Sequence, residues 1–318
     1  CRIGGIGMAT ALFSHESSLH HRTPAGHAEQ VARIECIQTA LSADRFEALD
    51  RREAPECSDA DILLCHPQSH LKAITAAEPA SGTVALDGDT YMSPGSTLAA
   101  RHAVGGCVSA VDAVMAGDVG NAFVACRPPG HHAEQSKPMG FCLFGTAAIA
   151  AKHALERHGL SRVAVVDFDV HHGNGTQALL WDEPRSLFIG SHQNPLWPGT
   201  GMPDETGAQD NVMNLPLPPH SDGRLMRATY DAQVFPALEA FQPELLILSA
   251  GFDAHKDDPL AQLEWSEDDF VWLTQKLCDV ADQHCGGRVV STLEGGYDLN
   301  ALASSVAAHV GVLMERAK

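Results

Sequence analysis

The stretch Val163-Ala-Val-Val-Asp-Phe-Asp-Val-His-His-Gly-Asn-Gly175 joins a run of apolar residues to a group of chemically active side chains. The nearly continuous apolar run is typical of a strand that is covered on both faces of a parallel sheet. Other runs of the same character occur along the chain. Together they predict strands at Ala122–Cys126, Val163–Phe168, Leu187–Ile189, Leu245–Ser249 and Val289–Thr292.

Amphipathic stretches separate these runs and predict helices near residues 98–116, 144–158, 223–239, 266–284 and 299–316. Start signals support two of them, Ser221-Asp222 before residue 223 and the acidic run after Ser266. Alternating strands and helices predict one α/β domain over residues 1–318, with a mostly parallel sheet. Residues 1–7 precede Met8 and are treated as candidate upstream sequence, outside the fold argument.

The charge balance bears on the class of partner. Lys and Arg total 21 against 40 Asp and Glu, which gives a formal charge of −19. Because no Lys/Arg cluster could neutralise a row of phosphates, we expect no nucleic-acid partner. An acidic surface favours encounter with a cationic substrate, although many enzymes are simply acidic.

Hydropathy and cysteine usage bear on location. No apolar stretch reaches the roughly 18 residues of a membrane span, and the features of a signal peptide are missing, so we expect no membrane partner. The nine cysteines include no CxxC pair, and most lie in apolar surroundings, among them Cys107, Cys126, Cys142 and Cys278. This pattern predicts buried free thiols in a reducing compartment, and we expect the cytoplasm.

Polar motifs directly follow four of the expected strands. They are Arg127-Pro-Pro-Gly-His-His132, Asp169-Val-His-His-Gly-Asn-Gly175 with Asp167 just before it, Ala250-Gly-Phe-Asp253 and Glu294-Gly-Gly-Tyr297. In open α/β sheets, ligands bind beyond the carboxyl ends of the strands. The sequence therefore predicts a site where these motifs meet.

Two carboxylates and one imidazole among these residues form a candidate metal site. Asp169 and His171 are two apart, so their side chains share one face of an extended strand end, and Asp253 arrives from another strand. Three protein ligands leave one position open, as in a catalytic zinc site, although this shell would also accept Fe(II). Singly, a strand-end His is usually an ordinary polar residue and such an Asp is more often a helix cap. Their joint occurrence favours a site.

The motifs resemble the signature blocks of the histone deacetylase and acetylpolyamine amidohydrolase superfamily. Supporting matches are Gly140-Phe-Cys142, Pro198-Gly-Thr-Gly201 and Asp258-Pro-Leu260. The resemblance runs from about Ala9 to Leu313 and is closest to class II and bacterial deacetylase-like amidohydrolases. It implies an arginase-like three-layer α/β/α sandwich with a mostly parallel sheet of about eight strands. It also implies a zinc-dependent hydrolase that cleaves the amide of an N-acyl amine, such as acetyl-lysine.

The resemblance assigns a role to each motif residue. His132 would be the principal general base and acid, while His131 acts mainly by its charge. The remaining implied roles are orientation of His131 by Asp167, pairing of His132 with Asn174, oxyanion stabilisation by Tyr297, and zinc binding by Asp169, His171 and Asp253. A structural potassium ion would lie near Asp167, Asp169, His171, Ser191 and His192.

The resemblance also implies a narrow channel for the acyl-lysine stem, lined by Gly140, Phe141, Trp197 and Leu260, and binding of hydroxamate-type inhibitors. Polyamine-selective relatives can carry an acidic residue where this chain has Leu260, which counts against that specialisation. A further departure is Gly26-His-Ala-Glu-Gln30 in place of a His-Pro-Glu stretch, with Arg33 matching the arginine that follows it.

Other functions stay open at this point. The same chemistry could serve an acetylpolyamine or another small acylated metabolite, since both leaving amines become cationic. A catalytically silent acyl-lysine-binding module would be expected to lack Tyr297, a metal ligand or the histidine pair, and all are present. A two-manganese relative of the arginases would need more ligands than the motifs supply. The sequence leaves self-association into a homo-oligomer open.

Overall fold

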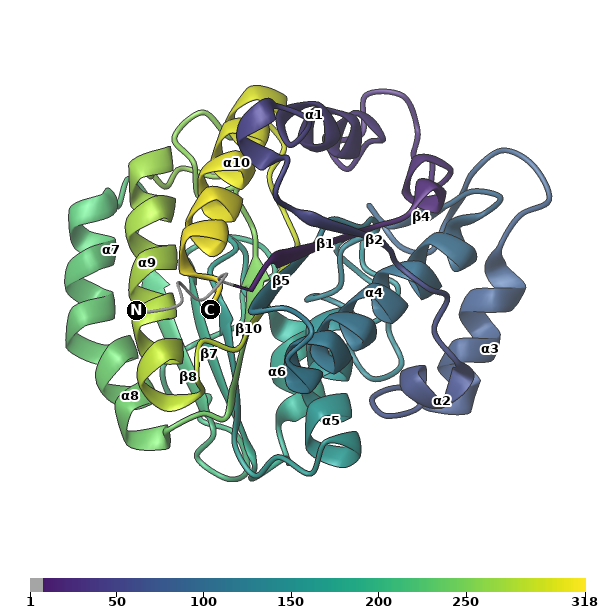
Figure 1. Ribbon diagram of the computed structural model, residues 1–318. Coiled ribbons are helices and arrows are strands. Elements are labelled where there is room, and N and C mark those ends of the chain that lie inside the picture. The colour runs from purple at the N-terminus through teal and green to yellow at the C-terminus, as the bar shows by residue number, and fades with distance from the viewer. Residues whose placement is uncertain (1–7) are drawn as a thin grey trace.

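An eight-stranded parallel sheet forms the centre of the structure, a computed structural model that describes residues 8–318 (Figure 1). The expectation about residues 1–7 lies outside the described residues. The strand order is β2-β1-β5-β10-β9-β6-β7-β8, and every neighbouring pair is parallel. The strands are β1 (Thr10–Ser14), β2 (Asp50–Glu53), β5 (Asn121–Val124), β6 (Val163–Asp167), β7 (Ser186–Gln193), β8 (Val212–Leu217), β9 (Leu245–Ala250) and β10 (Val289–Leu293). A separate antiparallel pair joins β3 (Val84–Ala85) to β4 (Tyr91–Met92).

Helices cover both faces of this sheet and make a three-layer sandwich (Figure 1). One layer is α2 (Asp59–Ile62), α3 (Gln68–Ala77), α4 (Ser96–Ala116), α5 (Thr146–Arg157) and α6 (Asn174–Leu180). The other is α1 (Ala32–Ala40), α7 (Gly223–Thr229), α8 (Phe235–Phe241), α9 (Glu267–His284) and α10 (Leu299–Arg316). Each layer packs a separate apolar cluster against its face of the sheet. The predicted α/β/α sandwich is confirmed.

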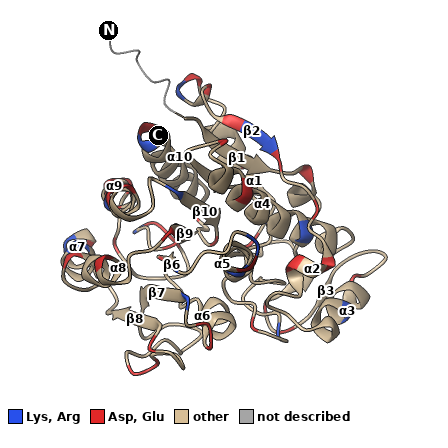
Figure 2. Cartoon of the chain, turned by 60° about the horizontal axis from the view of Figure 1, so that its bottom comes forward, with Lys and Arg blue, Asp and Glu red and all other residues tan. Residues whose placement is uncertain are grey.

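Burial of the central strands explains their nearly unbroken apolar sequences. Every residue of β6, β9 and β10 is buried, because helices lie against both faces. Figure 2 shows the charged residues mainly on the outer helices, the loops and the edge strand β2. Among residues 8–318, no helix is both long enough and apolar enough to cross a membrane. Cys107, Cys126, Cys142 and Cys278 are buried and unpaired, as predicted.

The structure differs from the expected elements in two respects. The helix expected over residues 223–239 is divided, because a five-residue π-helical turn, η3 (Tyr230–Val234), separates α7 from α8. Pro236 has no amide hydrogen for an α-helical bond, which explains why the regular pattern changes just before it. The strands β1, β2, β3, β4 and β8 and the helices α1, α2, α3 and α6 were not expected; β2 has the sequence Asp-Arg-Arg-Glu and, among the described residues, pairs only with β1.

Candidate active site

The three predicted metal ligands converge beyond the carboxyl ends of β6 and β9. Asp169 and His171 follow β6, and Asp253 follows β9. The Nδ1 atom of His171 lies 3.2 Å from Asp169 Oδ1 and 3.1 Å from Asp253 Oδ2. One ligand atom from each of the three residues lies within 4.8 Å of the others. A Cβ at Gly295 would overlap both carboxylates, so only glycine lets the neighbouring loop approach this closely.

Main-chain amides hold the two carboxylates in place. The amide of Gly295 donates to Asp169 Oδ2 at 2.8 Å, and that of Val170 donates to Asp253 Oδ1 at 2.8 Å. Burial and the charge of Asp169 raise the pKa of Asp253 to about 7. Burial alone would lower the pKa of His171, but Asp169 and Asp253 raise it to about 10. Crowded buried carboxylates beside one imidazole suit a divalent cation, and this donor set fits zinc or Fe(II).

His131 lies among carboxylates at the base of the site. Its Nδ1 is 2.9 Å from Asp167 Oδ2, and its Nε2 is 3.7 Å from Asp169 Oδ2. Burial alone would lower the pKa of His131, but the charges of Asp169, Asp167 and Glu294 raise it well above the usual range. The surroundings of His131 therefore favour an imidazolium ion.

His132 has a different set of neighbours. Its Nδ1 lies 2.8 Å from Asn174 Oδ1, and Asn174 Nδ2 donates to Glu134 Oε1 at 2.7 Å. Because Glu134 Oε1 accepts from the amide NH₂ group, the Asn174 amide is oriented with its oxygen toward His132. Nδ1 of His132 must then carry the hydrogen, which leaves a lone pair on Nε2. Burial, with the charges of His131 and His171, lowers the pKa of His132 well below its usual range, so this imidazole is neutral.

Arg33 holds the loop that carries Tyr297. Its guanidinium donates to Gly296 O at 2.6 Å and to Glu294 O at 2.5 Å, and lies 4.9 Å from the centre of the Tyr297 ring. Burial raises the pKa of the Tyr297 phenol well above its usual range, so its hydroxyl stays protonated and can donate. The sequence matched Arg33 to an arginine of the family and assigned it no role.

Glu294 holds the loop that carries the histidine pair. Its Oε2 accepts hydrogen bonds from the amides of Gly130 at 2.7 Å and His131 at 3.1 Å, and its Oε1 accepts one from Ser249 Oγ at 2.8 Å. Sequence reasoning quoted Glu294 within a motif and assigned it no role. The available signal was an acidic residue two positions after the predicted strand Val289–Thr292.

A cavity of about 240 Å³ leads to these groups. All four predicted substrate residues line it, together with two that the sequence did not indicate, Asp89 and Leu196; the predicted four are Gly140, Phe141, Trp197 and Leu260. Trp197 meets His132 edge to face with ring centroids 4.7 Å apart, and Phe141 meets Tyr297 in the same way at 5.8 Å. The cavity is therefore walled by aromatic rings and ends at His132, His171 and Tyr297.

The residues predicted around potassium lie behind this centre. Ser191 and His192 belong to β7, which pairs with β6 so that Asp167 is opposite Gly190. The Ser191 hydroxyl lies 2.8 Å from the Tyr230 hydroxyl, and the imidazole of His192 lies 3.0 Å from Gly201 O. The Nε2 atom of His192 is therefore engaged by Gly201 O, while its Nδ1 atom is buried without a hydrogen-bond partner among the described residues.

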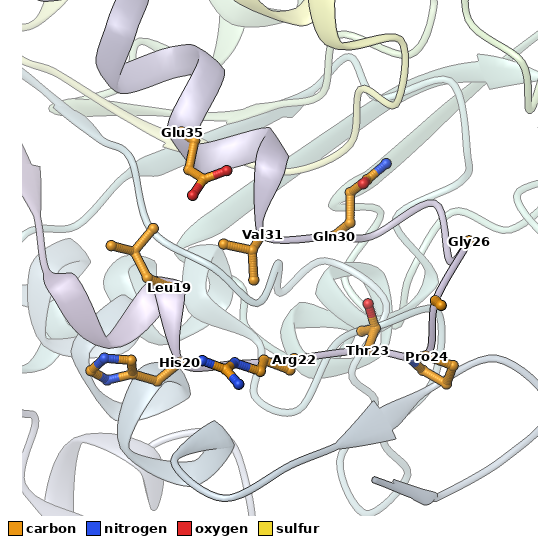
Figure 3. Close-up of a pocket in the computed structure, with 10 residues that line it drawn as sticks. Leu19, His20, Arg22, Thr23, Pro24, Gly26, Gln30, Val31 and Glu35 are labelled. Carbon is orange, nitrogen blue, oxygen red and sulfur yellow. The ribbon is translucent and has the colours of Figure 1, made fainter. Parts of the chain in front are cut away.

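A larger cavity, of about 570 Å³, lies beside the loop before α1 (Figure 3). Glu35 projects toward it from α1, and Arg22, Thr23 and Pro24 line the opposite side. None of the residues lining it belongs to the motifs that follow the strands. Chemistry, rather than cavity volume, therefore identifies the candidate site.

Comparisons with known proteins show which family this chain is similar to. Residues 27–313 match the family model described as the histone deacetylase domain. The chain is 40% identical over 282 residues to the histone deacetylase-like amidohydrolase of Pseudomonas aeruginosa, covering 86% of this chain and 73% of that protein. It is 33% identical over 298 residues to a probable deacetylase of Archaeoglobus fulgidus, covering 92% and 82%. The solved structure titled crystal structure of HDA15 HD domain superposes with a TM-score of 0.91 at 32% identity, covering 96% and 89%.

Proposed function

Since the chain belongs to the histone deacetylase family, whose members include deacetylases and amidohydrolases, we propose that it is a zinc-dependent hydrolase of N-acyl amines. The leading substrate class is an acyl-lysine or a similar amine. One observation carries this proposal: three buried ligand atoms converge beside a neutral imidazole and a protonated phenol at the end of an aromatic-walled cavity. We also propose that the whole chain serves as one catalytic domain, with Asp169, His171 and Asp253 holding the ion.

When bound, the zinc ion would polarise the amide carbonyl and lower the pKa of water. The bare Nε2 atom of His132 accepts the proton of the attacking water and then delivers it to the leaving amine. The imidazolium of His131, held by Asp167, stabilises the negative charge that develops beside it. The Tyr297 hydroxyl donates to the carbonyl oxygen as that oxygen becomes negative.

Features of the cavity support an extended, partly apolar substrate. Phe141 and Trp197 offer aromatic faces to a methylene stem, and Leu260 adds an apolar edge. Among the described residues, Asp89 is the one carboxylate lining this cavity, and it keeps a small cationic amine, such as an acetylpolyamine, as the second candidate substrate. A hydroxamate should occupy the same cavity, with its oxygens replacing those of water and the amide.

The structural potassium ion remains part of the proposal, with Asp167, Asp169, Ser191 and main-chain oxygens of His171 and His192 around it.

The buried free thiols support a reducing compartment, and we propose that this compartment is the cytoplasm.

Acyl release tests the proposed reaction. Zinc-loaded protein would be assayed with acetyl-lysine peptides, longer acyl-lysines and acetylpolyamines, in parallel with a chelator and with a hydroxamate. We expect turnover that both agents abolish and that added zinc restores after the chelator is removed. Turnover that persists in the chelator would contradict the metal-dependent mechanism. No turnover on any of these substrates, with zinc bound, would favour the acyl-lysine-binding module.

A further inference from the structure

A second set of metal-ligand side chains lies between α4 and α5. Asp112 is in the last turns of α4, His153 is in α5, and His158 follows the final residue of α5. The two helices pack side by side in the same layer (Figure 1). One ligand atom from each of the three residues lies within 4.8 Å of the others.

The two imidazoles converge on a single point. Nε2 of His153 and Nε2 of His158 each lie 2.7 Å from the same atom, Asp112 Oδ1. Their rings are 68° apart in orientation, with centroids separated by 5.6 Å. A carboxylate that only paired with two imidazoles could place one on each oxygen. Because both nitrogens approach the same oxygen, the three ligand atoms lie close enough together to share one ion.

Exposure makes this place accessible to an ion. The Asp112 side chain is 52% exposed and the His158 side chain 25%, while that of His153 is 8% exposed. Within residues 8–318, these two histidines are the ion-pair partners found for Asp112. The buried imidazole would supply a fixed ligand, and the half-exposed carboxylate has room to rotate.

The spacing requires only a small adjustment. Zinc binds nitrogen and oxygen ligands at about 2.0–2.2 Å, which places tetrahedral ligand atoms about 3.3 Å apart. Each 2.7 Å separation would therefore open by about half an ångström on binding. Two imidazoles with one carboxylate suit zinc and its neighbours among the first-row transition metals.

This cluster lies toward the amino ends of the strands, whereas the candidate active site lies beyond their carboxyl ends. His158 comes shortly before β6 begins at Val163, and Asp112 lies near the end of α4, before β5 begins at Asn121. The catalytic motifs, by contrast, follow the ends of the strands. We propose that Asp112, His153 and His158 form a second, non-catalytic site for a divalent transition-metal ion, which links α4 to α5.

Metal content tests this proposal directly. Wild-type protein and His158→Ala would be dialysed against the same buffered zinc concentration, and bound zinc would be measured by mass spectrometry. We expect the variant to hold one molar equivalent less than the wild type. His158 is the variant of choice because its partly exposed ring can be removed with less disturbance of the core than the ring of His153.

Two further variants sharpen the result. Asp112→Asn keeps an oxygen for the hydrogen bonds but removes the charged ligand, and should also lose the equivalent. His220→Ala is the matched control, because His220 is exposed and pairs with only one carboxylate, Glu264; it should keep the wild-type content. The same metal content in wild type, His158→Ala and Asp112→Asn would overturn the proposal.

A thermal measurement gives an independent readout. A bound ion stabilises the folded state, so zinc should raise the Tm of the wild type more than that of His158→Ala. Equal shifts would count against the site. The test of this site is independent of the proposed function. Asp253→Ala should lose the catalytic ion but keep the zinc equivalent that Asp112, His153 and His158 hold.

Discussion

The floor and the mouth of the candidate active site are built in opposite ways. The floor (Asp169, His171, Asp253, His131 and Tyr297) is at most 9% exposed, and carboxylates, imidazoles and main-chain amides bond to one another there.

The mouth is defined by Asp89, Phe141, Leu196, Trp197 and Leu260. Trp197 and Leu260 are 42% and 36% exposed, and the Leu260 side chain has no polar atom that could form a hydrogen bond. Because buried polar groups depend on their partners, changes in the floor should remove the reaction. Changes in the mouth should alter which substrate is preferred.

Asp253→Ala should have the largest effect. It removes a ligand that the Val170 amide holds in place, so the catalytic zinc equivalent should be lost and acyl release should fall to background. Asp257→Ala removes a carboxylate that is 61% exposed and serves as the control. Full occupancy of the catalytic zinc in Asp253→Ala would refute the ligand assignment.

Tyr297→Phe should lower kcat by roughly a hundredfold or more, because an oxyanion donor typically contributes that much. Zinc content should stay unchanged, since the phenol is not among the proposed ligands. The control is Tyr91→Phe, whose ring packs against His27 near the mouth. Unchanged turnover in Tyr297→Phe would remove this residue from the mechanism.

Glu134→Ala tests how the floor sets the proton on His132. Without the carboxylate, the Asn174 amide can rotate and present its NH₂ group to His132. The expected loss in kcat is smaller than the roughly hundredfold or more that a general base contributes. Glu134→Gln keeps an accepting oxygen and should retain most of the activity. Equal losses in the two variants would contradict an effect through amide orientation.

Asn174→Asp should change the pH profile. The neutral form of His132 is the active base, and burial with nearby cationic imidazoles holds its pKa low. A carboxylate at this position favours the imidazolium, so the pKa of His132 rises and the acid limb of kcat/KM moves to higher pH. Asn300→Asp, on the exposed start of α10, should leave the limb in place. A limb that moves to lower pH in Asn174→Asp would refute the pairing.

Leu260→Glu should have the smallest effect, because it changes only the mouth. A carboxylate there can pair with a secondary ammonium, so the ratio of acetylpolyamine to acetyl-lysine turnover should rise. Leu225→Glu adds the same charge at another exposed leucine and controls for net charge. If the ratio does not change, Leu260 does not select the substrate.

Much of the fold could be predicted because its signals are local. Strands buried on both faces, such as β6 and β9, show nearly unbroken apolar runs. The motifs that follow them mark the carboxyl ends of the strands. The edge strand β2 carries charged residues and has no such signal; pairing with β1 makes it a strand. The π-helical turn η3 precedes Pro236, which the sequence shows, but the contact of the Tyr230 hydroxyl with Ser191, distant along the chain, is visible only in the folded structure.

The amino-acid sequence by itself determined which chemical groups the site contains and which strand ends carry them, because both depend on residues close together in the chain. The family resemblance had already paired His131 with Asp167 and His132 with Asn174, but only the tertiary structure decided the rest of their surroundings. His131 lies among Asp167, Asp169 and Glu294, whereas His132 lies against Asn174, which Glu134 orients. Burial and neighbouring charges set the protonation of an imidazole, and those neighbours come from distant parts of the chain.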